Sequence, residues 1–184
     1  MPTRGIRTHD GFYTRLALGP ALLSSSWGST GSVSVTGMGP ALELAFGGTV
    51  GRGVVIGGGV YGASFLSPKI AYSGQSNSID SASVTTVGPF VDWYPSPEDG
   101  WHVQGSVGYA ITTYSGSSGK DSASGTGFGG LLGLGYEAWV ADEWSIGGML
   151  RCQYASASIS ASGSSSTVDT SVLVPAFVVT ATYH

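Results

Sequence analysis

The sequence predicts an all-β fold, an eight-stranded antiparallel up-and-down transmembrane β-barrel. Three observations indicate this fold: few charged residues, eight segments with period-two alternation, and charges that keep to one face of those segments. Charged residues make up 10% of the 184 residues, against roughly 25% in ordinary soluble proteins. A soluble chain of this size covers its surface with charged side chains, and this chain has too few to do so.

The predicted strands rest on alternation of apolar and polar residues. Glycine interrupts almost every apolar segment, and no sustained helical periodicity runs through the sequence. The expected strands are 11–23, 38–50, 53–66, 84–95, 100–114, 126–140, 143–155 and 168–183. Most exceed the roughly 9–11 residues that a tilted strand needs to cross a bilayer. We expect residues 1–10 to be an N-terminal extension and residues 11–184 to form one barrel domain.

The predicted connections alternate between short and long. Short turns are expected at 51–52, 96–99 and 141–142, and long polar loops at 24–37, 67–83, 115–125 and 156–167. Long loops at one end and short turns at the other are typical of outer-membrane barrels. Both termini then lie at the short-turn end, which would be periplasmic. An even number of strands closes the sheet and removes its edges.

The mid-strand charges all take the same parity along their strands. In segment 143–155, for example, Trp144 and Leu150 share one face, whereas Ser145 and Arg151 share the other. A charge facing lipid at mid-depth costs roughly 2–4 kcal/mol, whereas a charge in the lumen can pair. We therefore predict a lumen charge network that plugs the barrel, formed by the five mid-strand charges and one inward histidine: Arg15, Glu43, Asp92, Glu137, Arg151 and His102.

Aromatic residues cluster at the short-turn end of the expected strands. Such amphipathic rings favour the headgroup region of a membrane. We predict a periplasmic aromatic girdle made of Phe12, Trp93, Trp101, Trp139, Trp144 and Tyr183.

The chain resembles the small outer-membrane barrels of the OmpA/OmpX type. The resemblance is carried by the opening segment 11–19 (GFYTRLALG), the alternating loops, and a closing strand that ends in Tyr183. It covers residues 11–183 and implies a bacterial outer-membrane location, a lipid bilayer as surroundings, and the barrel assembly machinery as a partner during insertion. In that family a final aromatic residue helps the machinery recognise the chain; here Tyr183 is penultimate and His184 follows.

Charge and cysteine content exclude several other classes. The net charge is −4, and the seven cations are spread along the chain, so we expect no nucleic-acid partner. Cys152 is the single cysteine, which excludes an internal disulfide and a cysteine-based metal site. We expect a monomer. The first ten residues carry Arg4 and Arg7 without the apolar region that follows in a signal peptide.

Catalysis and cofactor binding have little support in the sequence. The only histidines are His9, His102 and His184; two lie near the termini, so His102 is the one candidate base, and no nucleophile elbow accompanies it. Three separated histidines without cysteine partners are poor metal ligands. The glycine spacings at 57–62 and 125–130 match a dinucleotide fingerprint, but neither opens a helix after a strand. We expect no enzyme and no cofactor.

These observations predict an integral outer-membrane barrel, structural or surface-exposed, with a polar plugged lumen and long extracellular loops available to a partner. Two alternatives stay open. One is a soluble lipocalin-like barrel that binds a small apolar ligand, which would carry its charges outside and its apolar residues inside. The other is a narrow channel.

Overall fold

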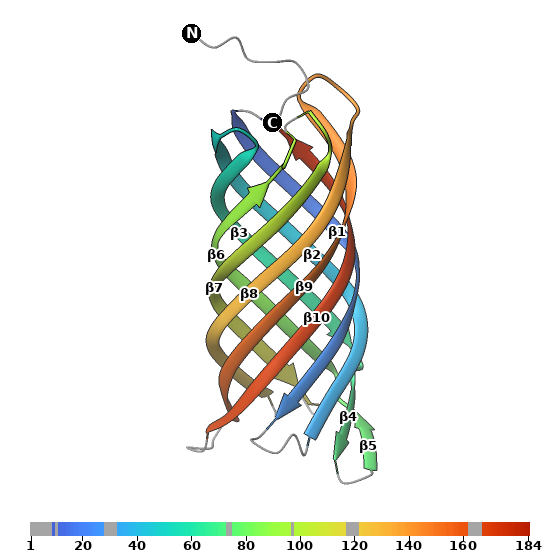
Figure 1. The fold of residues 1–184 in the computed structure, drawn as a ribbon. Coiled ribbons are helices and arrows are strands. Elements are labelled where there is room, and N and C mark those ends of the chain that lie inside the picture. The colour runs from blue at the N-terminus through green and yellow to red at the C-terminus, as the bar shows by residue number, and fades with distance from the viewer. Residues whose placement is uncertain are drawn as a thin grey trace.

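Eight long strands form one closed antiparallel sheet in the computed structural model (Figure 1). The structure describes residues 9, 11–27, 33–72, 75–96, 98–116, 122–161 and 167–184. The first strand pairs with both the second and the last, which closes the barrel. The predicted eight-stranded antiparallel barrel is thereby confirmed. Its strands are β1 (Phe12–Trp27), β2 (Val33–Gly51), β3 (Val54–Leu66), β6 (Ser81–Trp93), β7 (Trp101–Ser115), β8 (Ser122–Trp139), β9 (Trp144–Ala161) and β10 (Thr167–Tyr183).

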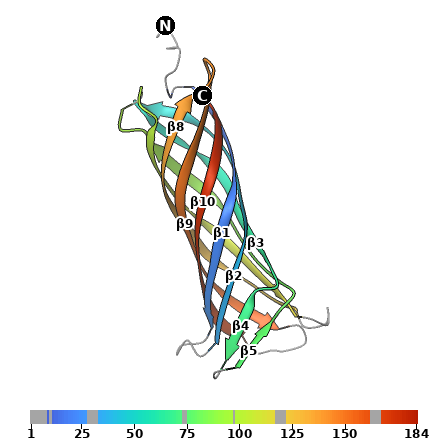
Figure 2. The ribbon, with the colours of Figure 1, turned by 90° about the vertical axis from the view of Figure 1, so that its right-hand side faces the viewer.

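Two further strands form a hairpin at the loop end of the barrel. They are β4 (Lys69–Tyr72) and β5 (Gln75–Ser78), within a segment that the sequence predicted as a loop. Strand β4 pairs with the start of β2, with Val33 opposite Tyr72. Figure 2 shows the hairpin beside the start of β2, at the end of the barrel away from the C-terminus. The two-stranded hairpin thus extends the barrel wall on one side of the loop end.

The strands run further toward the loop end than the sequence predicted. Strand β9, for example, continues to Ala161 instead of ending at 155, and β2 begins at Val33 instead of 38. The expected long loops at 24–37, 115–125 and 156–167 are therefore partly strand: residues 24–27, 33–37, 115, 122–125, 156–161 and 167 belong to the sheet. Residues 28–32, 117–121 and 162–166 of these loops lie outside the described residues. The physical reason is that the ladder uses backbone hydrogen bonds, so serine-rich and glycine-rich stretches extend the sheet without an apolar face.

The start of β1 and the end of β10 lie at the opposite end, together with the short turns (Figure 1). The turn between β2 and β3 contains Gly53, whose positive φ of 64° is a conformation that glycine adopts without steric cost. The hydroxyl of Thr49 donates a hydrogen bond of 3.2 Å to the carbonyl of His9. Of the predicted extension 1–10, only His9 is among the described residues. We call this end the turn end and the other the loop end.

The exterior of the barrel is apolar along the middle of the strands. Large hydrophobic side chains point outward, with exposed fractions such as 69% for Leu132 and 65% for Leu150. The other outward residues include Leu16, Leu18, Leu42, Leu134, Phe177 and Val179. An exposed apolar surface this continuous needs a hydrocarbon environment. No helix in the described part of the chain is long and apolar enough to span a membrane.

The interior is filled by the alternate side chains of the same strands. Toward the loop end the buried residues are mostly apolar, and they include Leu23, Val35, Phe65, Val84, Val172 and Val174. Toward the turn end Tyr13, Phe90 and Tyr94 surround a group of buried charges. We call these two parts of the lumen the loop half and the turn half. The sequence predicted a polar plugged lumen; in the loop half the interior is mostly apolar instead, because small and branched apolar side chains pack there.

Candidate functional site

All six residues predicted for the lumen network point into the barrel and are buried. Their exposed fractions range from 0% for Arg15 to 4% for Arg151. The contacts divide the six into two groups. Arg15, Asp92, His102 and Glu137 form one cluster near the turn end, and Arg151 pairs with Glu43 nearer the middle of the barrel.

Arg15 is the centre of the cluster at the turn end. Its Nη2 atom lies 2.7 Å from Oδ2 of Asp92 and 3.0 Å from Oε1 of Glu137. The same nitrogen donates to the hydroxyl of Tyr94 at 2.9 Å, and Nε donates to Thr182 at 3.2 Å. We name Arg15, Asp92, His102 and Glu137 the Arg15 cluster. Charge-assisted hydrogen bonds of this kind are the strong ones, because both partners are ionised.

His102 completes the cluster from the start of β7. Its Nδ1 atom lies 2.9 Å from Oδ1 of Asp92, which also accepts a hydrogen bond from Tyr13 at 2.9 Å through Oδ2. Gly135 on β8 faces the imidazole: a side chain at that position would collide with the ring. Glycine therefore makes the room that this buried histidine occupies.

Arg151 and Glu43 form a separate pair. Nη1 of Arg151 donates to Oε2 of Glu43 at 2.8 Å, and the amide of Gln104 donates to Oε1 at 2.9 Å. Arg151 also donates to the carbonyl of Leu42 at 3.1 Å. This pair balances one positive against one negative charge, whereas the Arg15 cluster sets one guanidinium against two carboxylates. The surplus carboxylate that the sequence implies is therefore in the Arg15 cluster.

Most residues of the predicted aromatic girdle point outward at the turn end. Phe12, Trp93, Trp101 and Trp144 are about half exposed, and the ring of Tyr183 lies 5.4 Å from that of Trp144. Tyr136, which the sequence argument missed, packs edge-on against Trp101 at 5.2 Å.

Trp139 departs from that prediction. It follows the inward Glu137 by two residues and so shares its face; its ring lies 4.8 Å from His9 and 5.0 Å from His184. It therefore covers the turn end of the lumen instead of joining the outer girdle.

The two terminal histidines, set aside in the sequence argument, meet at this end. Nδ1 of His9 lies 3.1 Å from Nε2 of His184, which is 3.6 Å from Oε2 of Glu137. Burial, and then the neighbouring His184, lowers the pKa of His9 to about 3, so its imidazole is neutral. Their proximity follows from barrel closure, which the positions of two residues at opposite ends of a sequence do not reveal.

A possible hydrolytic arrangement accompanies these histidines. The hydroxyl of Ser145 lies 3.2 Å from Nε2 of His184 and donates to Oε2 of Glu137 at 2.8 Å. Ser145 is 1% exposed, so no substrate can reach its oxygen in this conformation.

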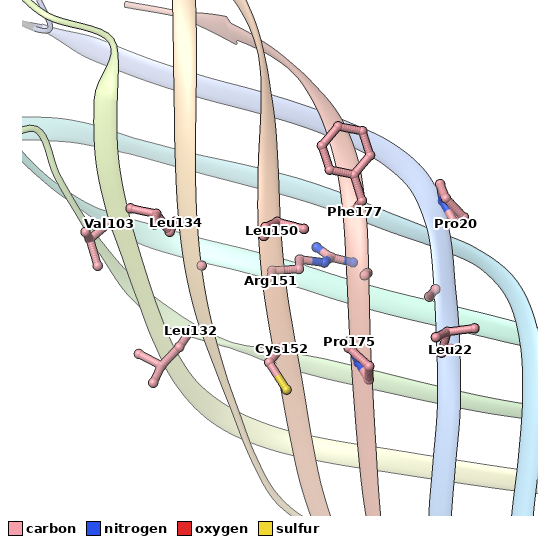
Figure 3. Close-up of a pocket in the computed structure, with 13 residues that line it drawn as sticks. Pro20, Leu22, Val103, Leu132, Leu134, Leu150, Arg151, Cys152, Pro175 and Phe177 are labelled. Atoms are coloured by element: carbon pink, nitrogen blue, oxygen red, sulfur yellow. The ribbon is translucent and has the colours of Figure 1, made fainter.

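The outer wall has an apolar hollow where β1, β10, β9 and β8 pass one another (Figure 3). Pro20, Leu22, Leu132, Leu150 and Phe177 line it. Pro20 and Pro175 lie on the two strands that close the barrel, and proline has no N–H to donate. The pairing of β1 with β10 passes from Leu18 opposite Val179 directly to Ala21 opposite Ala176. The closing seam thus has an interrupted ladder at mid-depth.

Comparisons with protein-family models and with curated protein sequences find no match. Solved structures match over nearly the whole chain. OprG of Pseudomonas aeruginosa is 14% identical with a TM-score of 0.53, over 97% of this chain and 99% of OprG. Neisserial surface protein A is 13% identical with a TM-score of 0.55, over 94% and 96%. Ail of Yersinia pestis, solved with the heparin analogue sucrose octasulfate, is 11% identical with a TM-score of 0.53, over 93% and 99%.

The closed sheet, the apolar exterior and the buried charges define a class: the protein is an integral membrane β-barrel. Within that class its fold is that of the small eight-stranded barrels. The resemblance to the OmpA/OmpX type is confirmed at the level of the fold. The lipocalin-like alternative is disfavoured by the outward-facing hydrophobic side chains, since a soluble barrel would bury them.

Proposed function

We propose that this protein is a structural, surface-exposed barrel whose lumen is closed to ions and whose loop end contacts a partner. The observation that carries the closed lumen is the Arg15 cluster. Its charged side chains come from β1, β6, β7 and β8 and lie within 3.0 Å of their partners at the three closest contacts. An eight-stranded barrel is just wide enough for side chains to fill its interior, so the cluster and the rings around it leave no water-lined path.

The loop half supports the same closure from the other end. Phe65, Val84 and Val172 are almost fully buried there, and an apolar packed interior does not hold a chain of water molecules. An ion would have to cross this region without hydration. The narrow channel is therefore the less favoured function.

The contact surface that we propose is the β4–β5 hairpin with the adjoining end of β2. Every residue of β5 is exposed, and Tyr72 is 61% exposed. Lys69 is the one cation among the described residues at the loop end, so an anionic ligand like the one solved with Ail has little to bind here. The exposed serine, asparagine and glutamine side chains favour an uncharged partner, held by hydrogen bonds.

The oligomeric state and the route of membrane insertion are also part of the proposed function. We propose a monomer, because the described strands close on themselves and leave no open barrel edge. Insertion would use the barrel assembly machinery, as for other barrels of this fold. The proposal includes no catalysis, since Ser145 and His102 are both buried.

Single-channel recording in planar bilayers tests the closed lumen. The purified barrel, shown to be folded by heat-modifiable gel migration, is expected to give no stable conductance. Replacing the central pair with Arg151→Ala and Glu43→Ala is the matched control, because it leaves the Arg15 cluster intact and should also stay closed. Stable unitary currents from the unmodified protein would establish a channel and overturn the proposal.

An epitope inserted between Tyr72 and Gln75 tests the contact surface. Antibody should label the hairpin on intact cells. An epitope placed in the turn at Arg52 is the control and should be labelled only after the outer membrane is permeabilised. Labelling with the opposite pattern would place the hairpin in the periplasm and refute a surface role.

A further inference from the structure

Three buried side chains with metal-binding atoms meet at the turn end: His9, Glu137 and His184. Their nearest ligand atoms all lie within 4.8 Å of one another. They come from three separate parts of the chain, before β1, within β8 and after β10. We propose that they form a site for a divalent transition-metal ion of the zinc type, which ties the two ends of the chain together.

The ligand set fits such an ion. Two imidazoles and one carboxylate are a known zinc-binding combination, with a fourth position left for water. Two ligands of one tetrahedral zinc ion lie about 3.3 Å apart, given bonds of about 2.0–2.1 Å. The nitrogens of His9 and His184 are 3.1 Å apart, which is close to that separation. Oε2 of Glu137 lies 3.6 Å from Nε2 of His184. All three ligand atoms lie within 4.8 Å of one another, so the longest separation must shorten as the groups close around an ion.

The surroundings of His9 hold its ring in the orientation that a metal ligand needs. Its Nε2 atom lies 3.2 Å from the carbonyl oxygen of Asp99 and donates to it. That hydrogen bond leaves Nδ1 unprotonated and directed at His184. Ligating histidines almost always donate their second N–H to such a carbonyl or carboxylate. The ring of Tyr94 stacks on His9 at a centroid distance of 3.6 Å, which fixes its plane.

Glu137 is held in a similar way. Its Oε1 atom accepts from Arg15 at 3.0 Å and from Thr182 at 2.7 Å. Oε2 is left facing Ser145 and His184. Oε2 also accepts hydrogen bonds, from Ser145 at 2.8 Å and from Tyr94 at 3.3 Å, and it is the oxygen nearer to His184. Carboxylates that ligate a metal ion are commonly hydrogen-bonded by neighbouring groups in this way.

The local charge balance also favours a cation. Arg15 faces both Asp92 and Glu137, so one guanidinium is set against two carboxylates. A divalent ion beside Glu137 would offset the charge of the second carboxylate in a place where solvent screening is weak. No other cationic lysine or arginine side chain contacts these two carboxylates among the described residues.

The position of the site gives the ion a structural role. His9 precedes β1 and His184 follows β10, and these two strands close the barrel. Their ladder is interrupted at mid-depth near Pro20 and Pro175. An ion that joins the two chain ends would hold the closing seam at its periplasmic mouth. This inference is independent of the surface contact proposed above, and each can fail without the other.

Metal titration of the untagged full chain in detergent micelles tests the site. After chelation, ZnCl2 is expected to bind at one equivalent and to raise the melting temperature, and CoCl2 to give the visible absorption of a tetrahedral complex. Mg²⁺ should not bind, since it prefers octahedral oxygen ligands. His9→Phe and His184→Phe keep an aromatic ring, and each should weaken Zn²⁺ binding by more than the roughly 10- to 100-fold that loss of an outer-shell partner costs.

Cys152→Ser is the matched control. Cys152 is exposed on the outer wall and is the one thiol in the chain, so its loss should leave binding unchanged. No saturable Zn²⁺ binding to the unmodified protein would overturn the proposal, as would full binding by both histidine variants or loss of binding in Cys152→Ser. If a histidine variant does not fold, the cobalt spectrum of the unmodified protein decides: an octahedral spectrum alone refutes the site.

Discussion

The two halves of the lumen are held by different interactions. In the turn half, Arg15 contacts Asp92 and Glu137, and the ring hydroxyls of Tyr13 and Tyr94 complete the hydrogen bonds. In the loop half, Phe65, Val84 and Val172 pack without charged neighbours among the described residues. The stability of the turn half depends on whether each buried charge keeps its oppositely charged side chain. The stability of the loop half depends on how completely apolar side chains fill the interior.

The difference shows how one narrow barrel uses two kinds of core. Burying a charge is costly unless it is paired, so the charged residues are concentrated where their partners are. Small and branched side chains fill the rest at close packing. Substitutions in the two halves should therefore lower the free energy of unfolding for different reasons: loss of an ion pair in the turn half and loss of packing in the loop half.

Arg15→Met should give the largest effect. It leaves Asp92 and Glu137 buried without their guanidinium, and breaking a buried pair costs about 3–5 kcal/mol. Urea unfolding in lipid vesicles, followed by tryptophan fluorescence, measures the loss of unfolding free energy. Adding Asp92→Asn and Glu137→Gln should recover part of it, because the uncompensated charges are removed. A variant that unfolds like the original would show that the cluster does not stabilise the barrel.

Arg151→Met should have a smaller effect. It leaves one buried carboxylate, Glu43, without its guanidinium and with one hydrogen bond, from Gln104. Arg15→Met leaves two such carboxylates, so we expect this loss to lie at the lower end of the same range of about 3–5 kcal/mol. Thermal melting should show a clear decrease, and Glu43→Gln on the same background should reverse most of it. An unchanged melting temperature for Arg151→Met would argue against the pair as a stabilising contact.

Ile159→Val should lower the free energy of unfolding least, and through lost packing instead of a lost ion pair. Ile159 lies in the loop half and is 5% exposed, and removing one buried methylene there costs about 0.5–1.5 kcal/mol. The loss should be the same at low and high salt, since no charge is involved. A strong salt dependence would mean that the loop half is not the apolar core described here.

The sequence predicted the strand number and the charged residues for a clear physical reason. A charge on a lipid-facing position is costly, so the parity of Arg15, Glu43 and Glu137 identifies the inward face directly. Alanine and valine carry no such signal, because both faces of these strands accept them. The apolar loop half was therefore missed.

The other differences between the predicted and observed structure are strand ends and side-chain contacts, which the alternation of residues along one strand does not specify. Strand extension through serine-rich stretches depends on backbone pairing with a neighbouring strand. The meeting of His9 with His184 depends on barrel closure. Both of these features are consequences of tertiary structure, and no periodic pattern in the sequence indicates them. Trp139 is different: it has the same parity as the inward Glu137, so the alternation itself indicates that it faces inward.

The central claim is that alternate residues face hydrocarbon while their neighbours face an enclosed interior, and β9 tests it most directly. A nitroxide on Cys152, the one natural thiol, is compared in lipid bilayers with one on Gln153→Cys in a Cys152→Ser background. The expected electron paramagnetic resonance result is that oxygen relaxes the label at 152 strongly and a water-soluble nickel complex does not, while the label at 153 is shielded from both. Strong relaxation by the nickel complex at 152 would contradict the account, because that position would then face water.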